Sequence, residues 1–499
     1  YRNRKIMGIK RYTANADTTI TNAYKENLRT RATGSNMGLA DSLEVFHIYG
    51  QESSTSAENS RILIDFPVTT TITSDRSAGT IPASGSVSWF LRVHNVAHPS
   101  TLPRNYNMTI SAVSRSWDEG TGLDMEGYSD SGSCNWTAAA SSSGGVTAWT
   151  TAGGDYHAST TGSTAYFDDG TEDIEIDISH LVEEWVKGQS GGAKGDIYGV
   201  GIKMENESAL SSSYTKKFSA RSSQYFFNRP TLEARWDSAT KDDRGNFYYS
   251  SSLAPAADNL NEIYLYNYSR GRLVDIPGIG SGDNISVSFY ASTSDAPSGS
   301  KLLLPVGGGV VTNLDVNATG SWVSTGIYSA NLAITASATP LTTIHDVWHS
   351  GTVEYHTGSI TPKSLNSSVQ NSVSQVVMNI TNLRDSYYRN ETARFRLYTR
   401  QKNWNPTIYT TAISTPANYI VESGSFKVVR LIDDLDVVAF GTGSDLHTQM
   451  SFDSTGNYFD LDMSMLEAGY GYGIKFAFYD GGAGAWNEYP DVFKFRVEE

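Results

Sequence analysis

The chain has 499 residues and a formal net charge of −15 at pH 7, which argues against a broad nucleic-acid surface because such a surface needs clustered Lys and Arg. Hydrophobic residues make up 39% of the sequence, so a core can be buried, yet there is no apolar run of the roughly 18 residues needed to span a bilayer. The single cysteine, Cys134, cannot form a disulfide within the chain. The length predicts about three domains, which must be held by their cores alone.

The first eleven residues carry a dense positive cluster on an otherwise acidic protein. Its members are Arg2, Arg4, Lys5, Lys10 and Arg11. One interpretation is an arm that anchors the protein on an acidic partner. The other is a solvated first strand or a frayed terminus. The sequence leaves both interpretations open.

Short apolar runs separated by turns follow through the first half of the chain. Strands are expected at 16–20, 43–45, 61–66, 88–93, 108–113 and 198–204. Such runs are typical of β-strands, and few segments have a helical period. The pattern therefore predicts an all-β chain.

The stretch from 173 to 204 contains the clearest local signals. A strand is predicted over 173–178, because isoleucine alternates strictly with acidic residues. A short helix follows, with Ser179 as its N-cap, an apolar face that includes Trp185, and Gly188 at its end. A second strand then returns into the core. The pattern predicts that this stretch has a structural role in the domain, with Trp185 buried. No residue in it is arranged for chemistry.

The densest acidic run of the sequence begins just before this strand. Calcium takes several oxygen ligands, so one interpretation is a loop site formed by Asp168, Asp169, Glu172 and Asp173. The run lacks the order of an EF-hand loop, and the alternative is the solvent-facing side of a strand. Calcium is the one cofactor that the sequence suggests.

An ordered series of short motifs in the first half resembles the DNRLRE domains, which are similar to a family of jelly-roll carbohydrate-binding modules. The motifs lie at 16–20, 36–38, 61–66, 81–85, 117–121, 177–185 and 228–234. The resemblance covers roughly 8–237 and implies a jelly-roll β-sandwich that binds polymers or builds surfaces, without catalysis. The chain departs from the family in a Gly/Ser/Thr-rich insertion at about 129–170. A large loop is expected there, and it puts any inherited ligand site in doubt.

Composition predicts how the rest of the chain is divided. A polar, charged linker at 238–245 ends the first domain, which is assigned to 1–237. Strands and turns predict a middle β-sandwich at 246–360, and short strands predict an immunoglobulin-like sandwich at 370–499. The expected fold is all-β, with three consecutive sandwiches and minimal helix.

Motifs in all three predicted domains look like those of virion structural proteins of marine, T4-like tailed phages. They lie at 218–237, 241–247, 346–351, 394–400 and 458–463. The resemblance implies a non-enzymatic component of the particle, on its head, neck or tail. Its partners would be other virion proteins in a homo- or hetero-oligomer. It would be assembled in the host cytoplasm and displayed on the virion.

Two constellations invite a chemical interpretation. His345 and His349 have zinc-ligand spacing only on a helix, whereas the expected strand sets them about 13 Å apart. Asp118 and Glu119 are adjacent, so on a strand they would point to opposite faces, and a structural role beside Trp117 is favoured. The sequence has no His-Glu-x-x-His motif, and both resemblances imply a protein without catalysis, so no enzymatic activity is predicted.

Aromatic residues near turns suggest a second function, a glycan- or receptor-binding adhesin on the particle surface. The candidates are Trp404, Trp486, Tyr470 and Tyr472. Sugars bind to aromatic rings that lie flat on a surface, whereas buried cores account for most aromatic residues. The sequence leaves both interpretations open.

Overall fold

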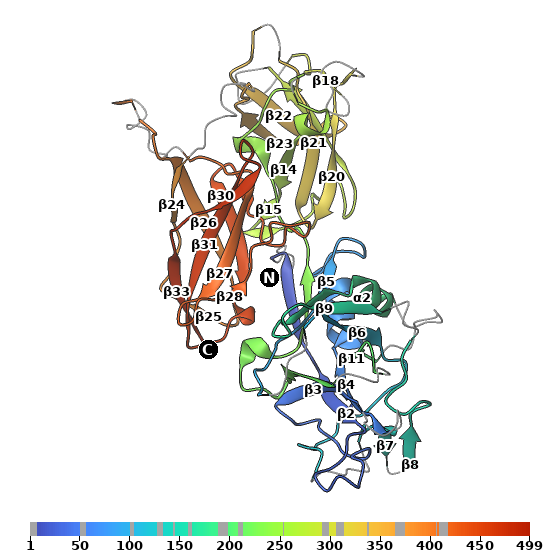
Figure 1. Ribbon diagram of the computed structural model, residues 1–499. Coiled ribbons are helices and arrows are strands. Elements are labelled where there is room, and N and C mark those ends of the chain that lie inside the picture. The colour runs from blue at the N-terminus through green and yellow to red at the C-terminus, as the bar shows by residue number, and fades with distance from the viewer. Residues whose placement is uncertain are drawn as a thin grey trace. The chain divides into compact units, whose positions relative to one another are not determined.

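The computed structural model describes residues 7–49, 56–99, 104–126, 133–142, 145–157, 162–187, 198–207, 213–252, 254–291, 299–305, 314–336, 339–364, 375–405, 407–408 and 418–499. The chain is 46% strand and 8% helix, so the predicted all-β fold of consecutive β-sandwiches with minimal helix is confirmed. It divides into two compact units, Gly8–Trp236 and Asp237–Glu499, the second of which also includes Met7 (Figure 1). In the described part of the chain, no helix is long and apolar enough to cross a membrane.

The first unit is a sandwich of two antiparallel sheets. Its strands are β1 (Ile9–Thr13), β2 (Ala16–Thr21), β3 (Ser42–Ile48), β4 (Glu58–Asp65), β5 (Ser88–Val93), β6 (Tyr106–Ala112), β7 (Ala138–Ser142), β8 (Gly145–Ala148), β9 (Ser163–Phe167), β10 (Ile174–Asp177), β11 (Val200–Met204), β12 (Ser213–Ser219) and β13 (Thr231–Arg235). Its helical elements are η2 (Val68–Ile72), α1 (Thr73–Ser77), α2 (Ser179–Val186) and η4 (Phe226–Asn228). One sheet has the order β1-β13-β5-β10, and the other β12-β3-β4-β11-β6-β9, with β2 paired to β4. Both sheets contribute to a single hydrophobic core, which includes Trp89 and Leu232 from the first and Ile62 and Val200 from the second.

Helix α2 belongs to this core as the sequence predicts. Leu181, Val182 and Trp185 are buried in it. The predicted N-cap is wrong, because Ser179 is already the first helical residue and its hydroxyl accepts a hydrogen bond from the backbone N–H of Trp89 at 2.7 Å. Gly188, the predicted end of the helix, lies outside the described residues.

The Gly/Ser/Thr-rich insertion was expected to be a large loop, but its described part builds a second, smaller core. Strands β7 and β8 form a hairpin there, and Cys134, Trp136 and Trp149 are buried together with Leu63 of β4. Leu63 alternates with the main-core residues Ile62 and Ile64, so β4 is buried on both faces. Burial also raises the pKa of Cys134 well above its usual value.

The second unit contains the remaining strands. The first group is β14 (Asn261–Tyr266), β15 (Tyr268–Ser269), β16 (Arg272–Leu273), β17 (Ile285–Tyr290), β18 (Leu304–Pro305), β19 (Leu314–Asp315), β20 (Ala318–Ser324), β21 (Ile327–Leu332), β22 (Ile344–Ser350) and β23 (Val353–Ile360), with the 3₁₀ turns η5 (Asp243–Gly245) and η6 (Ala257–Asn259). Six of these strands form one antiparallel sheet, in the order β14-β21-β20-β17-β22-β23. We call it the middle sheet. Its core includes Phe289, Tyr328 and Trp348.

The last sandwich completes the second unit. Its elements are β24 (Val376–Ile380), β25 (Ser386–Tyr388), β26 (Thr392–Gln401), β27 (Gly424–Arg430), β28 (Leu435–Val438), β29 (Ser451–Asp453), β30 (Gly456–Asp462), η8 (Met463–Met465), β31 (Gly471–Asp480), β32 (Ala485–Glu488) and β33 (Phe493–Glu498). The sheet β24-β26-β30-β29 packs on the sheet β25-β33-β31-β27-β28, to which β32 adds. The ring of Phe459 stacks on Phe426 at 4.0 Å and on Phe395 at 5.2 Å. The predicted split of this unit at 360–370 stays a prediction.

Candidate functional site

The basic residues predicted as an anchor divide into two groups. Arg2, Arg4 and Lys5 lie outside the described residues. Lys10 and Arg11 belong to β1, where Lys10 pairs with Asp75 at 2.6 Å and Arg11 with Glu233 at 2.6 Å. These two cations therefore hold β1 in the first unit. The anchor hypothesis stays a prediction for the residues that precede β1.

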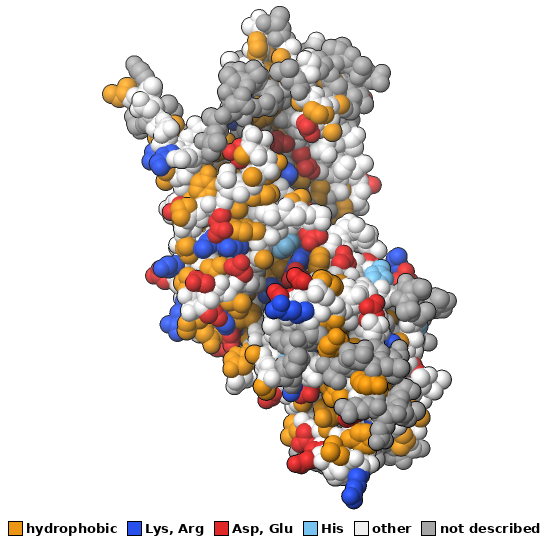
Figure 2. All heavy atoms as spheres, viewed as in Figure 1, with side chains coloured by type: hydrophobic (Ala, Val, Ile, Leu, Met, Phe, Trp, Pro, Cys, Tyr) orange, Lys and Arg blue, Asp and Glu red, His pale blue; other side chains and the backbone are white. Residues whose placement is uncertain are grey.

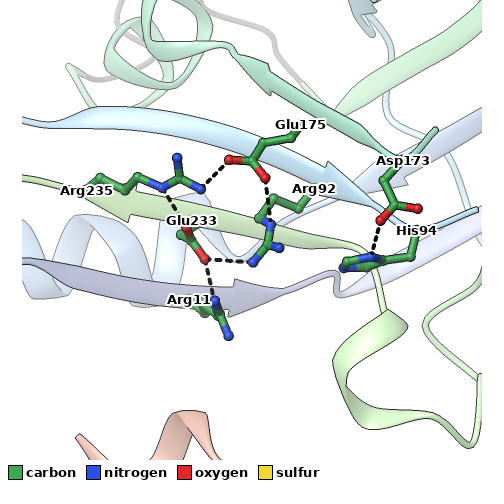
Figure 3. Close-up of polar contacts among 7 residues, drawn as sticks. All are labelled: Arg11, Arg92, His94, Asp173, Glu175, Glu233 and Arg235. Carbon is green, nitrogen blue, oxygen red and sulfur yellow. Dashed lines mark hydrogen bonds and ion pairs between the residues drawn. The ribbon is translucent and has the colours of Figure 1, made fainter. Parts of the chain in front are cut away.

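Arg11 is part of a cross-strand ion cluster on the sheet β1-β13-β5-β10 (Figure 3). Glu233 accepts hydrogen bonds from Arg11 at 2.6 Å, Arg92 at 3.1 Å and Arg235 at 2.6 Å. Glu175 pairs with Arg235 at 2.5 Å and with Arg92 at 3.5 Å. Burial alone would raise the pKa of Glu233, but the three guanidinium groups hold it well below its usual range. The cluster therefore cross-links all four strands of this sheet.

The four carboxylates proposed as calcium ligands have protein partners of their own or are exposed. Glu172 accepts a hydrogen bond from the backbone N–H of Asp169 at 2.5 Å. Asp173 lies 2.9 Å from Nδ1 of His94 and accepts the N–H of Asn95 at 2.7 Å. Asp168 is exposed. No group of three or more His, Cys, Asp or Glu side chains in the described part of the chain is arranged to hold a metal ion.

A positively charged side chain of the protein itself lies in this acidic turn. The ammonium of Lys216, a side chain with no exposed surface, donates hydrogen bonds to the carbonyls of Gly170 at 2.7 Å and Glu172 at 2.9 Å. It also lies 5.1 Å from the ring of Phe167 and 5.3 Å from that of Phe218. Burial lowers the pKa of Lys216 to about 8. Two carbonyls that a bound calcium ion could use are therefore already hydrogen-bonded.

The aromatic residues predicted for sugar binding do not form one surface. Tyr472 has no exposed surface, and its hydroxyl donates to the carbonyl of Glu467 at 2.7 Å. Trp486 is half-buried against Tyr479, which lies seven residues from Tyr472 along β31, roughly 23 Å away.

The other two candidates each lie beside an arginine. Tyr470 is half-buried, with the Arg430 guanidinium 5.1 Å from its ring centre. Trp404 is half-buried, with the Arg400 guanidinium at 5.7 Å. Neither ring is fully open to a sugar.

Residues 240–247, expected to be part of a linker, are built into the second unit. We call this segment the brace. On the side of the last sandwich, the N–H of Thr240 donates to Oγ of Ser451 at 2.9 Å, and the N–H of Asp242 donates to the carbonyl of Phe452 at 3.1 Å. On the side of the middle sheet, Phe247 is buried in the core. The brace therefore connects two separately cored bodies.

The strongest contact of the brace is the ion pair between Arg244 and Asp346 of β22. Two parallel hydrogen bonds of 2.7 Å join them, and Nε1 of Trp348 donates to the same carboxylate at 2.8 Å. Asp346 has no exposed surface. Burial alone would raise its pKa, but the Arg244 guanidinium holds that pKa below the usual range. Bidentate pairing of this kind is both strong and specific in geometry.

Residues of two other segments, 394–400 and 458–463, also pair with one another. Arg394 binds Asp460 through two hydrogen bonds of 2.8 Å, and its guanidinium lies 4.4 Å from the ring centre of Tyr458. On the face drawn in Figure 2, basic and acidic side chains are interspersed over the last sandwich. These motifs supply structural ion pairs.

The two histidines considered for zinc lie on strand β22, as predicted. His349 forms a pair that superficially resembles a nucleophile and its base, because its Nε2 lies 2.7 Å from Oγ of Ser288. Ser288 has no exposed surface, and Nδ1 of His349 lies against the carbonyl of Gly351 at 3.0 Å. Among the described residues, no carboxylate is hydrogen-bonded to this ring, and a substrate could not reach the hydroxyl. The pair ties β17 to β22.

Glu119 likewise has a structural role. Its carboxylate pairs with the Arg221 guanidinium and accepts the backbone N–H of Asp17 at 2.8 Å. Its interactions therefore fasten the loop beside Trp117 to strand β2.

Two clefts in the second unit include residues of the brace in their linings. The larger, of about 610 Å³, is lined by polar residues that include Lys241, Asp243, Lys363 and Glu422. Burial raises the pKa of Asp243 to about 7. We call the smaller one, of about 290 Å³, the tyrosine cleft. Its lining residues come from the brace, the strands near the middle sheet and the last sandwich. They are Thr240, Tyr264, Tyr266, Tyr268, Leu273, Val323, Ser324, Ile327, Arg394, Arg396, Asp453 and Tyr458.

The tyrosine cleft was not predicted from the sequence, although one signal for it is present. Tyr264, Tyr266 and Tyr268 alternate with Leu265 and Asn267, and period-two spacing places residues on one face of a strand. The residues that face them come from distant parts of the sequence and carry no such signal.

Comparison with known proteins adds no assignment to these features. The sequence matches no known family of proteins, and no curated protein matches it.

Proposed function

We propose that this chain is a non-enzymatic structural component of a tailed-phage virion that acts through contacts with other virion proteins. One observation carries the proposal. The motifs through which the sequence resembles such proteins supply the ion pairs Arg244–Asp346 and Arg394–Asp460, which fix elements of the second unit. Ion pairs that hold elements of a fold together are expected in a protein whose task is to keep a shape.

The polar groups that could suggest catalysis support the same proposal. Glu119 and Asp346 are held by arginines, and Ser288 is out of reach of a substrate. A general acid or base must instead lie within hydrogen-bond reach of a bound substrate.

The direct test is to purify particles of the phage that encodes this chain and to identify their proteins by mass spectrometry. We expect the chain in several copies per particle, at a fixed position in a particle map. Its absence from purified particles would overturn the proposal.

The anchor hypothesis needs a variant that leaves β1 intact, because Lys10 and Arg11 are used within the first unit. We expect a triple change of Arg2, Arg4 and Lys5 to Ala to reduce incorporation into particles, because it removes three positive charges from the segment before β1. The melting curve of the purified chain serves as the folding control. Unchanged incorporation would contradict an electrostatic anchor. The structural proposal would then be decided by mass spectrometry of the particles alone.

A further inference from the structure

The tyrosine cleft has one aromatic wall. Ile263 and Leu265 of β14 are buried in the core of the middle sheet, so the residues between and after them point away from that core. Tyr264 is 7% exposed, Tyr266 is half-buried, and Tyr268 is 61% exposed. The rings of Tyr264 and Tyr266 are nearly parallel, at 20°, with centres 6.0 Å apart. The wall thus runs from a buried ring to an open one.

The opposite wall is polar and charged, and strands β26, β29 and β30 form it. Arg396 pairs with Asp453 through Nη2 at 3.0 Å, and Arg394 pairs with Asp460. Both guanidinium groups lie over the ring of Tyr458, at 4.4 Å and 5.3 Å from its centre. Each positive charge on this wall is therefore matched by a carboxylate.

This arrangement selects for a particular ligand chemistry. The two charges of each ion pair offset one another, so this wall favours neither sign of a charged ligand, whereas a hydroxyl group can donate to a carboxylate and accept from a guanidinium. Flat tyrosine rings offer apolar contact to the C–H faces of a sugar. A volume of about 290 Å³ is close to the lower limit of about 300 Å³ for ligand pockets. Such a cleft suits a short segment of a sugar chain.

We propose that the tyrosine cleft binds a neutral oligosaccharide, with Tyr266 and Tyr268 stacking on its rings and the Arg396–Asp453 pair hydrogen-bonding to its hydroxyls. A structural role accounts for Tyr264 and Tyr458, which are almost buried. It does not account for Tyr268, whose ring is mostly in solvent at the mouth of the cleft. The proposal does not depend on where the chain sits in a particle.

The test begins with the full chain on a printed array of neutral and acidic oligosaccharides. The neutral oligosaccharide that binds best is then titrated, free in solution, by calorimetry. We expect Tyr266→Ala and Tyr268→Ala each to weaken its binding by about tenfold, since each removes one stacking contact. Tyr388→Ala is the matched control, because Tyr388 is 55% exposed and lies on β25, outside the cleft. This variant should bind like the unaltered chain.

Three results would overturn the proposal: no neutral oligosaccharide bound on the array, stronger binding of acidic than of neutral ones, or binding that Tyr266→Ala and Tyr268→Ala leave unchanged. Melting curves of the variants show whether each is folded. If Tyr266→Ala unfolds, Tyr268→Ala decides the matter, because that ring is mostly exposed. These results concern the cleft alone, whereas mass spectrometry of particles concerns the structural role.

Discussion

The two units use ion pairs on different scales. In the first, the cluster around Glu233 joins neighbouring strands of a single sheet (Figure 3). In the second, the Arg244–Asp346 pair belongs to a brace that joins the middle sheet to the last sandwich. In the first unit both sheets contribute to one core, whereas the described core of the middle sheet contains no residue of the last sandwich. Similar chemistry therefore joins strands that share a core in one unit and elements that belong to different cores in the other.

The largest effect is expected from breaking the brace. Arg244→Ala leaves the Asp346 carboxylate, which has no exposed surface, without its ion partner. Removing one member of a buried pair costs about 3–5 kcal/mol. Urea unfolding of the full chain, followed by a probe in the second unit, should show this loss. The first unit should keep its own transition.

The control for this change is Arg384→Ala. The Arg384–Glu391 pair has a distance of 2.8 Å but is solvent-exposed, with side-chain exposures of 53% and 30%. Its loss should cost less than about 1 kcal/mol. If both variants lost the same free energy of unfolding, burial of Asp346 would not be the reason that the brace stabilises the second unit.

The contribution of hydrophobic packing to the first unit is tested at Trp185. Trp185→Ala removes a buried ring from the core and should cost about 3 kcal/mol. This is the low end for such a change, because Nε1 of Trp185 is buried and finds no acceptor among the described residues. Trp185→Phe keeps most of the apolar volume and removes that donor, so its melting temperature should stay close to that of the unaltered chain. A Trp185→Ala variant that melts like the unaltered chain would contradict the core assignment.

Local patterns predicted the elements of these units, but not the pairs that join distant ones. The alternation at 173–178 and the apolar face of α2 can be read from neighbouring residues, and both are correct. The polar composition of 238–245 predicted a linker, because nothing in it reveals that Arg244 meets a carboxylate 102 positions away. The acidic turn suggested calcium because its cation, Lys216, comes from another strand.

The large loop predicted for the insertion at about 129–170 is wrong for a different reason. Its Gly, Ser and Thr content is typical of loops, and this hid the tryptophans that form the second core. The run Ile62–Leu63–Ile64 was the available signal, because a strand with apolar residues on both faces needs a cover on each.

The smallest expected effect concerns a buried acid in the first unit and depends on pH. Asp17 is 1% exposed; its Oδ2 accepts the N–H of Arg221 at 2.6 Å, and its Oδ1 is buried with no partner among the described residues. Burial raises the pKa of Asp17 to about 7, and the neighbouring Glu119 adds to this. The folded state therefore binds more protons than the unfolded state between about pH 4 and pH 7, so the contribution of Asp17 to stability falls as the pH rises through this window.

Asp17→Asn keeps an acceptor for the Arg221 N–H and removes the titration. The variant should match the unaltered chain at pH 4 and be more stable at pH 8, by roughly 1–2 kcal/mol once water near the site is allowed for. Melting of the first unit at the two pH values measures the difference, with Asp168→Asn, a change at an exposed position, as the control. If Asp17→Asn changed the stability of this unit equally at pH 4 and pH 8, the titration of Asp17 would not be coupled to folding between these values. Burial would then not be what determines the charge state of Asp17.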